Sequence, residues 1–588
     1  MLLVFALCGG EARASDTQTS IAWQGWSEGV FEKAKKENKF VILDLEAIWC
    51  HWCHVMADTT YQDPKVVGLI NSRYLPVRVD QDANPDISLR YEDWGWPATV
   101  VFSADGTEIV KRRGYIPPPA MAALLEAIIK DPTPGPSISA DLDVKPAEQT
   151  FLNPEQKKKL EEEHNALYDT EFAGWGMQLK LIDSNSLEFA MVRAMAGDES
   201  EARRAQATLD AAINLLDAEW GGFFQYSDER NWKSPHFEKI MLIQSQYMRL
   251  YAIAYSLWKE PRTLQAAKRV NDYLARFWTS PEGAFYTSQD ADVNAETRGK
   301  DFYSLRDADR VKLGKMPEID THVYSRENGW MIASLAVLHD VTGEEKYLDE
   351  ALSAARWILQ NRNLSGGGFR HDAADRAGPY LGDTLAMGQA FLNLYISTAD
   401  PQWLELAEKS SAFIEKFFKD ENPGGFITAV IPSGATGVFQ KPVKQVDENV
   451  SVARLANSLF HFTGKEKYKK MAADAMRYLA SPVLLQNKRF LTGLLLADRE
   501  LSEEPTHLTV VGPKNDETTK ALYRTALGYP PIYRRIEWWD TNEGPLPNPD
   551  VDYPELKKPA AFLCANKSCS VPFFLPEKLI VAMSKLKK

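Results

Sequence analysis

The stretch Lys39-Phe-Val-Ile-Leu-Asp-Leu-Glu-Ala-Ile-Trp-Cys-His-Trp-Cys-His54 decides the fold of the first part of the chain. Its first half is an apolar run typical of a buried strand, and the residues after the second cysteine predict a helix. A cysteine at a helix N-terminus has its thiolate stabilised by free N–H groups and by the positive end of the helix dipole. Cys53 lies one turn beyond Cys50, close enough to attack a mixed disulfide. The stretch therefore predicts a redox-active dithiol.

Other residues fit the same site. His51 adds partial positive charge between the cysteines, which lowers the pKa expected for Cys50. Asp44 lies in the middle of the apolar strand, where an acid is costly unless it is used. Trp96-Pro97 precedes the strand 98–102, and a proline there is able to adopt the cis form beside the thiols. Three indoles are the candidate substrate contacts of this site: Trp49, Trp52 and Trp96.

Residues 20–131 alternate between helical and strand patterns, and Asp105-Gly106 marks the turn of a closing hairpin. One parallel crossover followed by an antiparallel hairpin predicts an α/β domain. Residues 132–149 are rich in Pro, Ser and Asp and lack apolar periodicity, which predicts a linker.

Residues 150–503 contain one helical pattern after another, with loops that place glycine before phenylalanine, such as Gly366-Gly-Gly-Phe369. Antiparallel hairpins that each bury one face must close on their neighbours, and roughly 350 residues suit six of them. The expected fold class is thus an α/β domain followed by an all-α (α/α)6 toroid. Residues 504–588 return to strand-like runs and predict a small α/β C-terminal segment.

Such a toroid has a funnel at one end, and ionisable residues recur near the Gly-Phe loops. The candidate substrate-binding residues of this region are His236, Glu238, Asp290, Asp292 and Asp383. Paired carboxylates across a funnel are used in glycoside hydrolysis, whereas a histidine with a glutamate suits proton transfer at a sugar carbon. The alternative interpretation is that acids at helix starts are ordinary caps.

The first domain resembles thioredoxin, on the spacing of Asp44 to Cys50, the Val79-Asp80-Gln-Asp82 strand end and the Trp96-Pro-Ala-Thr strand start. The resemblance implies that Cys50 is the attacking thiol and Cys53 the resolving one. It also implies that Asp44 is the proton acceptor for Cys53 and that Pro97 is a cis-proline that helps to bind peptide.

Over its length the sequence resembles the spermatogenesis-associated, thioredoxin-domain-containing proteins. The resemblance rests on Cys50-His-Trp-Cys-His-Val-Met56, Pro235-His-Phe-Glu-Lys239, Phe285-Tyr286 with Asp290-Ala-Asp292, Asn328-Gly329 with Met331-Ile-Ala333, and Cys569-Ser-Val-Pro572. It implies a thioredoxin-like domain fused to a six-hairpin glycosidase-like domain. The chain departs from the family pattern at Ile243-Gln-Ser245 and at Arg326-Glu327, both expected in the funnel.

Several alternatives stay open for the cysteines. Cys-x-x-Cys-His also spells c-type haem attachment, a zinc site would need ligands from a second knuckle, and a degenerate thioredoxin fold would leave the cysteines idle. The dithiol is preferred, with no cofactor and no metal. The tail pair, Cys564 and Cys569, is expected to be an inert disulfide or two free thiols; exchange with the first pair is the alternative.

The chain has 588 residues, a formal net charge of −13 and five cysteines, too few for a disulfide framework. An acidic surface repels a phosphate backbone, so no nucleic-acid partner is expected. An apolar run from Leu2 to Leu7 before Ala12-Arg-Ala14 predicts a signal peptide over residues 1–14, and hence a periplasmic or secreted protein. A cytoplasmic location is the alternative. No other segment approaches the roughly 20 apolar residues of a membrane span.

The leading hypothesis is a thiol–disulfide oxidoreductase that acts on a protein dithiol or disulfide partner, with a toroid that binds that partner or a carbohydrate. One alternative is a carbohydrate-active enzyme, either a glycoside hydrolase or a sugar epimerase, whose thioredoxin domain is only structural. Another is a binding module for glycoproteins that carries out no reaction.

Overall fold

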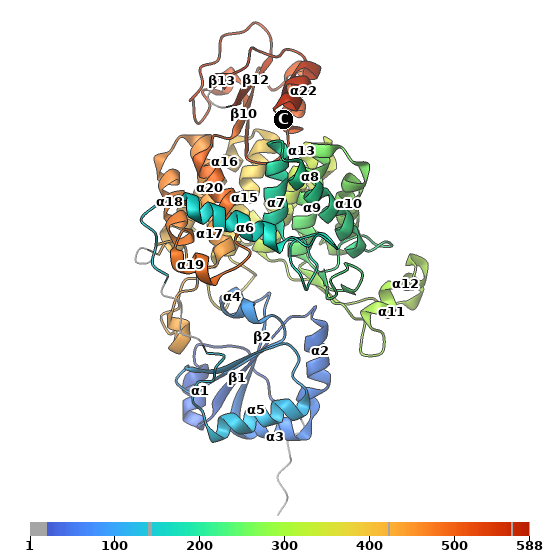
Figure 1. The fold of residues 1–588 in the computed structure, drawn as a ribbon, viewed down its shortest axis with the longest axis vertical. Coiled ribbons are helices and arrows are strands. Elements are labelled where there is room, and N and C mark those ends of the chain that lie inside the picture. The colour runs from blue at the N-terminus through green and yellow to red at the C-terminus, as the bar shows by residue number, and fades with distance from the viewer. Residues whose placement is uncertain (1–19, 139–143, 421–423, 566–567, 587–588) are drawn as a thin grey trace, which may run out of the picture.

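The computed structural model describes residues 20–138, 144–420, 424–565 and 568–586. Three parts follow one another along the long axis (Figure 1): an N-terminal α/β part, a ring of helices in the middle, and a C-terminal α/β part at the other end. The signal peptide predicted over residues 1–14 lies outside the described residues.

The N-terminal part is built on one four-stranded sheet in the order β2-β1-β3-β4. Its strands are β1 (Phe40–Glu46), β2 (Tyr74–Asp80), β3 (Ala98–Phe102) and β4 (Glu108–Arg113). β2 runs parallel to β1, whereas β3 runs antiparallel to β1 and to β4. The predicted parallel crossover and closing hairpin are therefore confirmed.

Helices cover both faces of this sheet, which is why β1 reads as a continuous apolar run. They are α1 (Val30–Glu37), α2 (His51–Asp58), α3 (Pro64–Arg73), α4 (Pro85–Tyr91) and α5 (Pro118–Lys130). α3 and α5 pack on one face, while α1 and α4 pack on the other. α4 was not predicted, because its seven residues are too few to produce a clear helical period.

The middle part is a closed ring of six inner helices. They are α7 (Ser184–Met195), α9 (Met241–Trp258), α13 (Ser325–Thr342), α15 (Leu381–Thr398), α17 (Val446–Thr463) and α20 (Thr492–Ser502). Each inner helix contacts the next, and α20 contacts α7, so the ring closes. The predicted (α/α)6 toroid is confirmed.

Six outer helices surround this ring. They are α6 (Pro154–Leu167), α8 (Glu199–Ala212), α10 (Pro261–Tyr273), α14 (Glu345–Asn361), α16 (Pro401–Phe418) and α18 (Glu466–Leu479). Five of them follow the inner helix on which they pack. The sixth, α6, precedes the ring in the sequence and packs against α20. The first helix of the toroid thus completes its last hairpin.

Short elements connect the hairpins. They are β5 (Tyr226–Ser227), β6 (Pro235–His236), β7 (Lys239–Ile240), β8 (Ser288–Gln289), β9 (Ile319–Asp320), α11 (Gly299–Tyr303), α12 (Asp307–Leu313) and α19 (Pro482–Asn487). β7, β8 and β9 form a small sheet.

The Gly-Phe loops have a common structural role. In each, the backbone N–H of the phenylalanine donates a hydrogen bond to the side chain of the fourth residue of the following inner helix. The four pairs are Phe223 with Gln244 (2.7 Å), Phe285 with Asn328 (2.8 Å), Phe369 with Thr384 (3.2 Å) and Phe426 with Asn449 (2.8 Å). These bonds tie each loop to the first turn of an inner helix, so the N-terminal ends of these helices lie in one layer.

The C-terminal part contains β10 (Thr506–Val511), β11 (Arg534–Trp539), β12 (Ala560–Ala565), β13 (Ser568–Cys569), α21 (Glu517–Leu527) and α22 (Pro576–Lys585). It covers the C-terminal ends of the inner helices: the Tyr523 hydroxyl donates to the carbonyl of Ile396 at 2.6 Å, and Arg534 pairs with Asp340. β11 was not predicted. The thioredoxin-like part lies at the opposite end of the ring (Figure 1).

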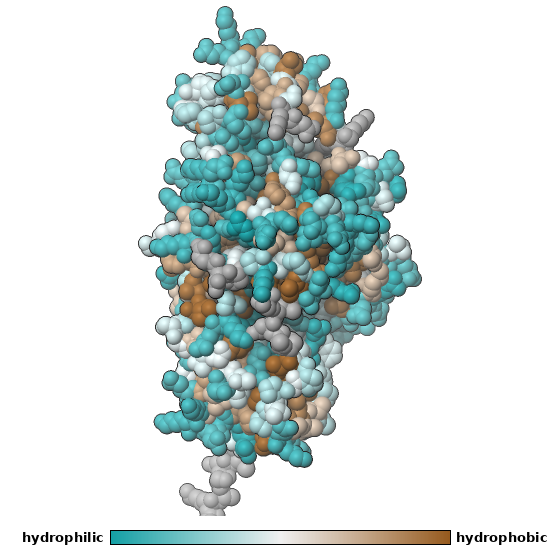
Figure 2. Space-filling model, turned by 60° about the vertical axis from the view of Figure 1, so that its left-hand side comes forward, coloured by the Kyte–Doolittle hydropathy of each residue, from teal (hydrophilic) through white to brown (hydrophobic). Residues whose placement is uncertain are grey.

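The surface is mostly polar. In the face drawn in Figure 2, hydrophilic side chains spread over all three parts, and hydrophobic side chains form small separate groups. Within the part of the chain that the structure describes, no helix combines the length and the apolar content that crossing a bilayer requires.

Candidate functional site

The two cysteines of the first motif form a disulfide at the start of α2. Cys50 is the N-cap residue of this helix, and its Sγ accepts a hydrogen bond from the backbone N–H of Cys53 at 3.1 Å. Both cysteines are buried, with 4% and 3% of their surface exposed. The sulfurs therefore lie at the positive end of a helix dipole, as the sequence predicts.

The loop before β3 completes the immediate surroundings. The peptide bond between Trp96 and Pro97 is cis, and Ala98 pairs with Leu45 at the end of β1. Trp96 packs on a small buried cluster that contains Ala47, Trp49, Cys50 and Cys53. The toroid contributes Ile240 to the same cluster.

Asp44 is buried, but its carboxylate has partners of its own. Arg78 donates to it at 3.0 Å and the Tyr61 hydroxyl donates at 3.1 Å. Burial raises the pKa of Asp44, while Arg78 opposes this shift. Glu46, at the end of the same strand, has a pKa of about 7, because burial and the nearby Asp44 charge disfavour its ionised form. The role of Asp44 as proton acceptor for Cys53 stays a prediction.

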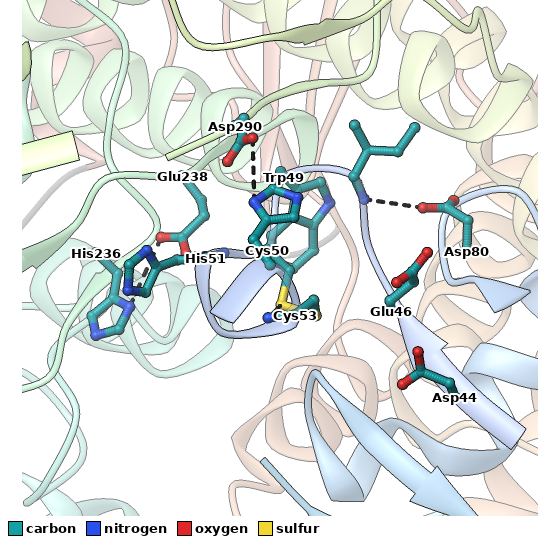
Figure 3. Close-up of a disulfide and its surroundings, with 12 residues drawn as sticks. Asp44, Glu46, Trp49, Cys50, His51, Cys53, Asp80, His236, Glu238 and Asp290 are labelled. Carbon is teal, nitrogen blue, oxygen red and sulfur yellow. Dashed lines mark hydrogen bonds and ion pairs between the residues drawn. A yellow bond between two sulfur atoms is a disulfide. The ribbon is translucent and has the colours of Figure 1, made fainter. Parts of the chain in front are cut away.

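Acidic residues of the toroid lie against α2 (Figure 3). The Glu238 carboxylate accepts a hydrogen bond from the His51 backbone N–H at 3.4 Å. Nδ1 of the His51 ring lies 2.5 Å from an oxygen of Asp292. His54 pairs with Asp290 at 3.5 Å, and the backbone N–H of the next residue of that loop donates to the carbonyl of Trp49 at 3.4 Å. The toroid thus binds the backbone and the side chains of the cysteine motif.

Burial and charge shift the titration of these groups. The hydrogen bond that the His51 ring donates to Asp292 raises the pKa of His51, which favours a positive charge beside Cys50. Burial raises the pKa of Glu238 to about 7, and one of its carboxylate oxygens is buried without a hydrogen-bond partner. Burial lowers the pKa of His236, whose ring lies 3.9 Å from Glu238. A carboxyl group that titrates near neutral pH therefore lies at the helix terminus that carries the sulfurs.

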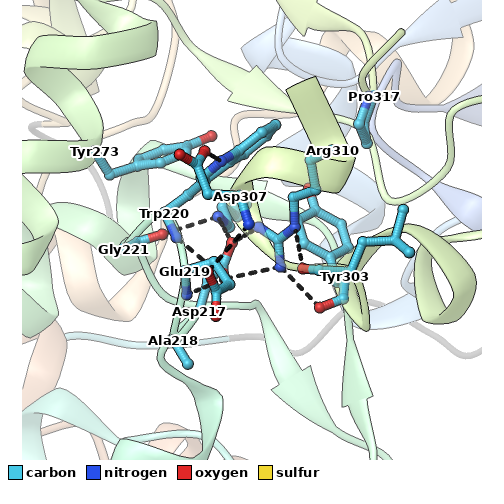
Figure 4. Close-up of polar contacts among 12 residues, drawn as sticks. Asp217, Ala218, Glu219, Trp220, Gly221, Tyr273, Tyr303, Asp307, Arg310 and Pro317 are labelled. Atoms are coloured by element: carbon cyan, nitrogen blue, oxygen red, sulfur yellow. Dashed lines mark hydrogen bonds and ion pairs between the residues drawn. The ribbon is translucent and has the colours of Figure 1, made fainter. Parts of the chain in front are cut away.

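A buried charge cluster holds the toroid loops in place (Figure 4). Asp217 accepts hydrogen bonds from Lys239 at 3.0 Å and from Arg310 at 2.8 and 3.1 Å. Lys239 follows Glu238 directly. Arg310 belongs to α12, in the long connection between β8 and β9 that also contains Asp292. Because a buried charge is costly without its partner, this cluster fixes both segments against α2.

A cavity of about 680 Å³ lies between the thioredoxin-like part and the toroid. Its walls come from the N-terminal ends of the inner helices on one side and from α4 and the cysteine loop on the other. Among the side chains that line it are Trp49, Trp96, Arg326, Glu327, Trp330 and Glu448. The funnel of the toroid is therefore present, and the thioredoxin-like part covers it.

Several carboxyl groups of the cavity have raised pKa values. Burial raises the pKa of Glu448 to about 8, that of Glu92 to about 7 and that of Asp447 to about 6. Glu327 instead pairs with Arg326 at 2.6 Å. The cavity thus combines a carboxyl group that is mainly neutral at pH 7, Glu448, with the Arg326–Glu327 ion pair.

The residues predicted to line the funnel lie elsewhere in the structure. Glu238, Asp290 and Asp292 contact α2, His236 lies beside Glu238, and none of the four lines the cavity. Asp383 is buried, where it accepts a hydrogen bond from the backbone N–H of Arg326 at 2.9 Å and pairs with His371 at 2.8 Å.

The three tryptophans predicted to contact the substrate lie in two different places. Trp49 and Trp96 lie between the disulfide and the cavity, whereas Trp52 is 43% exposed and packs beside Tyr115. Sequence reasoning missed Glu92, because it follows the short helix α4 that was itself not predicted. Of the two departures from the family pattern, Arg326-Glu327 lines the cavity, while Gln244 holds a Gly-Phe loop.

The tail cysteines form a second disulfide, Cys564–Cys569, which closes the hairpin of β12 and β13. It lies in the C-terminal part, at the other end of the ring from α2 (Figure 1). In this structure the two pairs do not meet, so direct exchange between them is not supported. Within the described ranges, no group of three or more His, Cys, Asp and Glu side chains has an arrangement that would hold a metal ion.

Comparison with known proteins supports the N-terminal assignment. Residues 14–130 match the Thioredox_DsbH family model, described as "Protein of unknown function, DUF255". The chain is 21% identical to spermatogenesis-associated protein 20 of Homo sapiens, over 95% of this chain and 89% of that protein. The Rattus norvegicus protein of the same name is 22% identical, over 75% of this chain and 72% of its own length.

Among solved structures, a cellobiose 2-epimerase from Bacillus thermoamylovorans covers 55% of this chain and 86% of its own, with 12% identity and a TM-score of 0.44. A D-mannose isomerase covers 55% of this chain and 85% of its own, with 14% identity and a TM-score of 0.43. Similarity at this level decides no activity. Together with the fold, the family-model and sequence matches confirm the resemblance drawn from the motifs: the chain is similar to spermatogenesis-associated protein 20, and its structure joins a thioredoxin-like domain to a six-hairpin toroid.

Proposed function

We propose that this protein is a thiol–disulfide oxidoreductase that uses the Cys50–Cys53 pair. The observation that carries the proposal is the position of Cys50 as the N-cap of α2, with its sulfur bonded to Cys53 and held by a backbone N–H. A thiolate formed there is stabilised by the helix N-terminus and by the positive charge that Asp292 favours on His51.

The reaction follows from this arrangement. In the reduced protein, the Cys50 thiolate attacks one sulfur of a substrate disulfide, which breaks that bond and releases one substrate thiolate. The Cys53 thiolate then attacks the Cys50 sulfur of the mixed disulfide and releases the second substrate thiol. The substrate gains two electrons and two protons, and the protein returns to the disulfide seen here. The reverse reaction oxidises two thiols.

The proposal is tested by a glutathione redox titration of the full chain, read by the mass added on thiol alkylation. We expect one two-electron transition for the Cys50–Cys53 pair, which is absent in Cys50→Ser and in Cys53→Ser. A double variant, Cys564→Ser with Cys569→Ser, serves as the matched control and should keep the transition. Sulfurs that stay joined, or stay unreactive, over the whole range of glutathione potentials would contradict the proposal.

The same proposal includes export to an oxidising compartment. Disulfides persist in secreted and periplasmic proteins and are rare in the cytosol. The second disulfide, Cys564–Cys569, supports this location because it links two paired strands in a part of the molecule remote from α2. Cell fractionation with the native N-terminus tests it, and recovery of the uncleaved protein with all thiols reduced in the cytosol would contradict it.

A second candidate function is proton transfer on a carbohydrate in the cavity. It is favoured by Glu448, a carboxyl group with a pKa of about 8, and by the Arg326–Glu327 pair that lines the same cavity. A protonated acid and an ionised one are the pair that glycoside chemistry requires. Glycan turnover that is lost in Glu448→Gln and retained in Cys50→Ser would support this candidate. Turnover that is unchanged in Glu448→Gln would eliminate it.

A further inference from the structure

The disulfide and the cavity share a wall. Trp49, Trp96 and Ile240 pack on the buried cluster that contains Cys50 and Cys53, and the same three residues line the cavity. The lining of the cavity includes neither cysteine, so these three side chains form the wall that separates the disulfide from the cavity.

The toroid covers the surroundings of the disulfide through direct contacts. It binds the carbonyl of Trp49, the backbone N–H of His51 and, through His371 at 2.7 Å, the carbonyl of Asp82. A folded partner protein, which the sequence led us to expect, would have to displace the toroid to reach Cys50. A small molecule in the cavity would need only the movement of side chains in the shared wall.

We propose that the substrate of the dithiol is a small thiol or disulfide carried on an uncharged, polyhydroxylated body, such as a thiosugar, which binds in the cavity between the two domains. This inference rests on the proposed function and adds its substrate class.

The lining of the cavity favours a body of this kind. The N-terminal ends of the inner helices converge there, and their own first-turn acids, among them Glu327 and Asp447, already occupy the positive ends of the helices. A further anion would meet these carboxyl groups. Of the four basic side chains in the lining, Arg326 is paired with Glu327, Arg454 with Glu188 and Glu500, and Lys488 with Asp93, while Arg489 is exposed. Three of the four positive charges are thus already neutralised by carboxylates of the protein.

Neutral donors and acceptors make up much of the remaining lining: Gln81, Gln225, Gln246, Gln389, Gln445 and Ser451. Amide and hydroxyl groups both donate and accept hydrogen bonds, as sugar hydroxyls do. Trp49, Trp96 and Trp330 add flat apolar faces. The volume of about 680 Å³ lies within the roughly 300–1,000 Å³ that is usual for small-molecule sites.

The thiosugar disulfide is reduced by the same two exchange steps as the substrate disulfide of the proposed function. The Cys50 thiolate displaces one thiosugar from the symmetric disulfide, and Cys53 displaces the second from Cys50. Two electrons and two protons pass from the protein dithiol to the substrate, which leaves as two thiosugar molecules. A single turnover of the reduced protein therefore needs no further reductant.

The experiment measures single-turnover oxidation of the reduced full chain by four disulfides at equal concentration. They are the disulfide of 1-thio-β-D-glucose, 2-hydroxyethyl disulfide, glutathione disulfide and insulin. We expect the thioglucose disulfide to react at least tenfold faster than the other three, after correction for the intrinsic exchange rate of each with free dithiothreitol. Equal corrected rates, or a preference for insulin, would overturn the inference.

A variant tests the position of the substrate. Ser451→Trp places an indole in the cavity, on α17 and away from the cysteines, and should slow the reaction with thioglucose disulfide at least tenfold. Lys470→Trp, on the exposed face of the outer helix α18, is the matched control and should react like the wild type. A Ser451→Trp protein that folds and reacts at the wild-type rate would place the substrate elsewhere.

A competition experiment needs no variant. Methyl β-D-glucoside carries no sulfur, so it should slow the reaction with thioglucose disulfide while leaving the redox potential of the Cys50–Cys53 pair unchanged. If the pair titrates normally and the glucoside has no effect at any concentration, the substrate class is wrong and the oxidoreductase stands. If the pair shows no transition in glutathione buffers, the proposed function itself fails.

Discussion

The two disulfides of this protein are a natural comparison, because both close short loops and differ in their surroundings. Cys50 and Cys53 lie buried at a helix N-terminus, with His51 and Glu238 beside them. Cys564 and Cys569 lie on a terminal hairpin, and Cys569 is exposed. The difference teaches that the helix N-terminus, and not the presence of two cysteines, is what favours a thiolate at the first pair.

The largest expected effect distinguishes the two disulfides by the rate of thiol–disulfide exchange. Cys50→Ser is expected to slow exchange with 2-hydroxyethyl disulfide by roughly 1,000-fold or more, because it removes the attacking thiolate. Cys53→Ser should instead accumulate a mixed disulfide on Cys50, visible by mass spectrometry. Cys569→Ser should stay within about twofold of the wild-type rate. Equal losses of exchange rate in Cys50→Ser and Cys569→Ser would contradict the proposed difference between the two disulfides.

The second effect concerns stability. Replacing both Cys564 and Cys569 by serine should lower the free energy of unfolding by about 2 kcal/mol, the value expected for releasing such a short loop. Exchange at Cys50 should not change. Urea titration and the exchange assay measure the two quantities on the same sample. A double variant that loses exchange as well would show that the tail pair takes part in the reaction.

The third effect concerns redox potential. Above pH 7 the ionised Glu238 carboxylate at the start of α2 should oppose the Cys50 thiolate, since both are negative. Glu238→Gln removes that charge, and the couple should become more oxidising by about 20 mV, which corresponds to about 1 kcal/mol. Below pH 6 the shift should disappear, because the wild-type carboxyl is then protonated. A shift independent of pH would point to a structural cause.

The smallest effect concerns the contact between the domains. The pKa of His51 is raised above its ordinary value of 6.5 by Asp292, so the pair stabilises the folded state fully below pH 6.5. This contribution is lost as the pH rises through the raised value. His51→Gln should therefore cost about 1 kcal/mol or less at pH 5.5 and little at pH 9, given that the ring is 27% exposed. Urea unfolding at both pH values, with Trp52→Gln as the surface control, measures it.

Much of the fold could be predicted because its signals are local. The apolar run of β1, the Asp105-Gly106 turn and the Gly-Phe loops each depend on a few neighbouring residues. Among the elements that were missed, α4 and β11 are short and carry weak periodicity. Their absence from the prediction also concealed Glu92, which follows α4 in the cavity wall.

The candidate site was predictable only in part. The cysteines and the cis bond before Pro97 follow from motifs, whereas the destination of Glu238 and Asp292 does not. Both were expected in the funnel, and both instead contact His51 of α2, from which they are separated by 187 and 241 positions in the sequence. Short β-strands and the buried Asp217 cluster bring them there, and those are properties of the packed toroid.

By itself, the sequence determined that two sulfurs would lie at the N-terminus of a helix and that helical hairpins would follow. Both depend on backbone geometry and hydrogen bonding, which act over a few residues. Only the tertiary structure decided that the toroid would bury those sulfurs, supply Glu238 beside them and leave a polar cavity against their shared wall. The physical reason is that desolvation, and with it the pKa of each buried acid, depends on every segment that packs around a group.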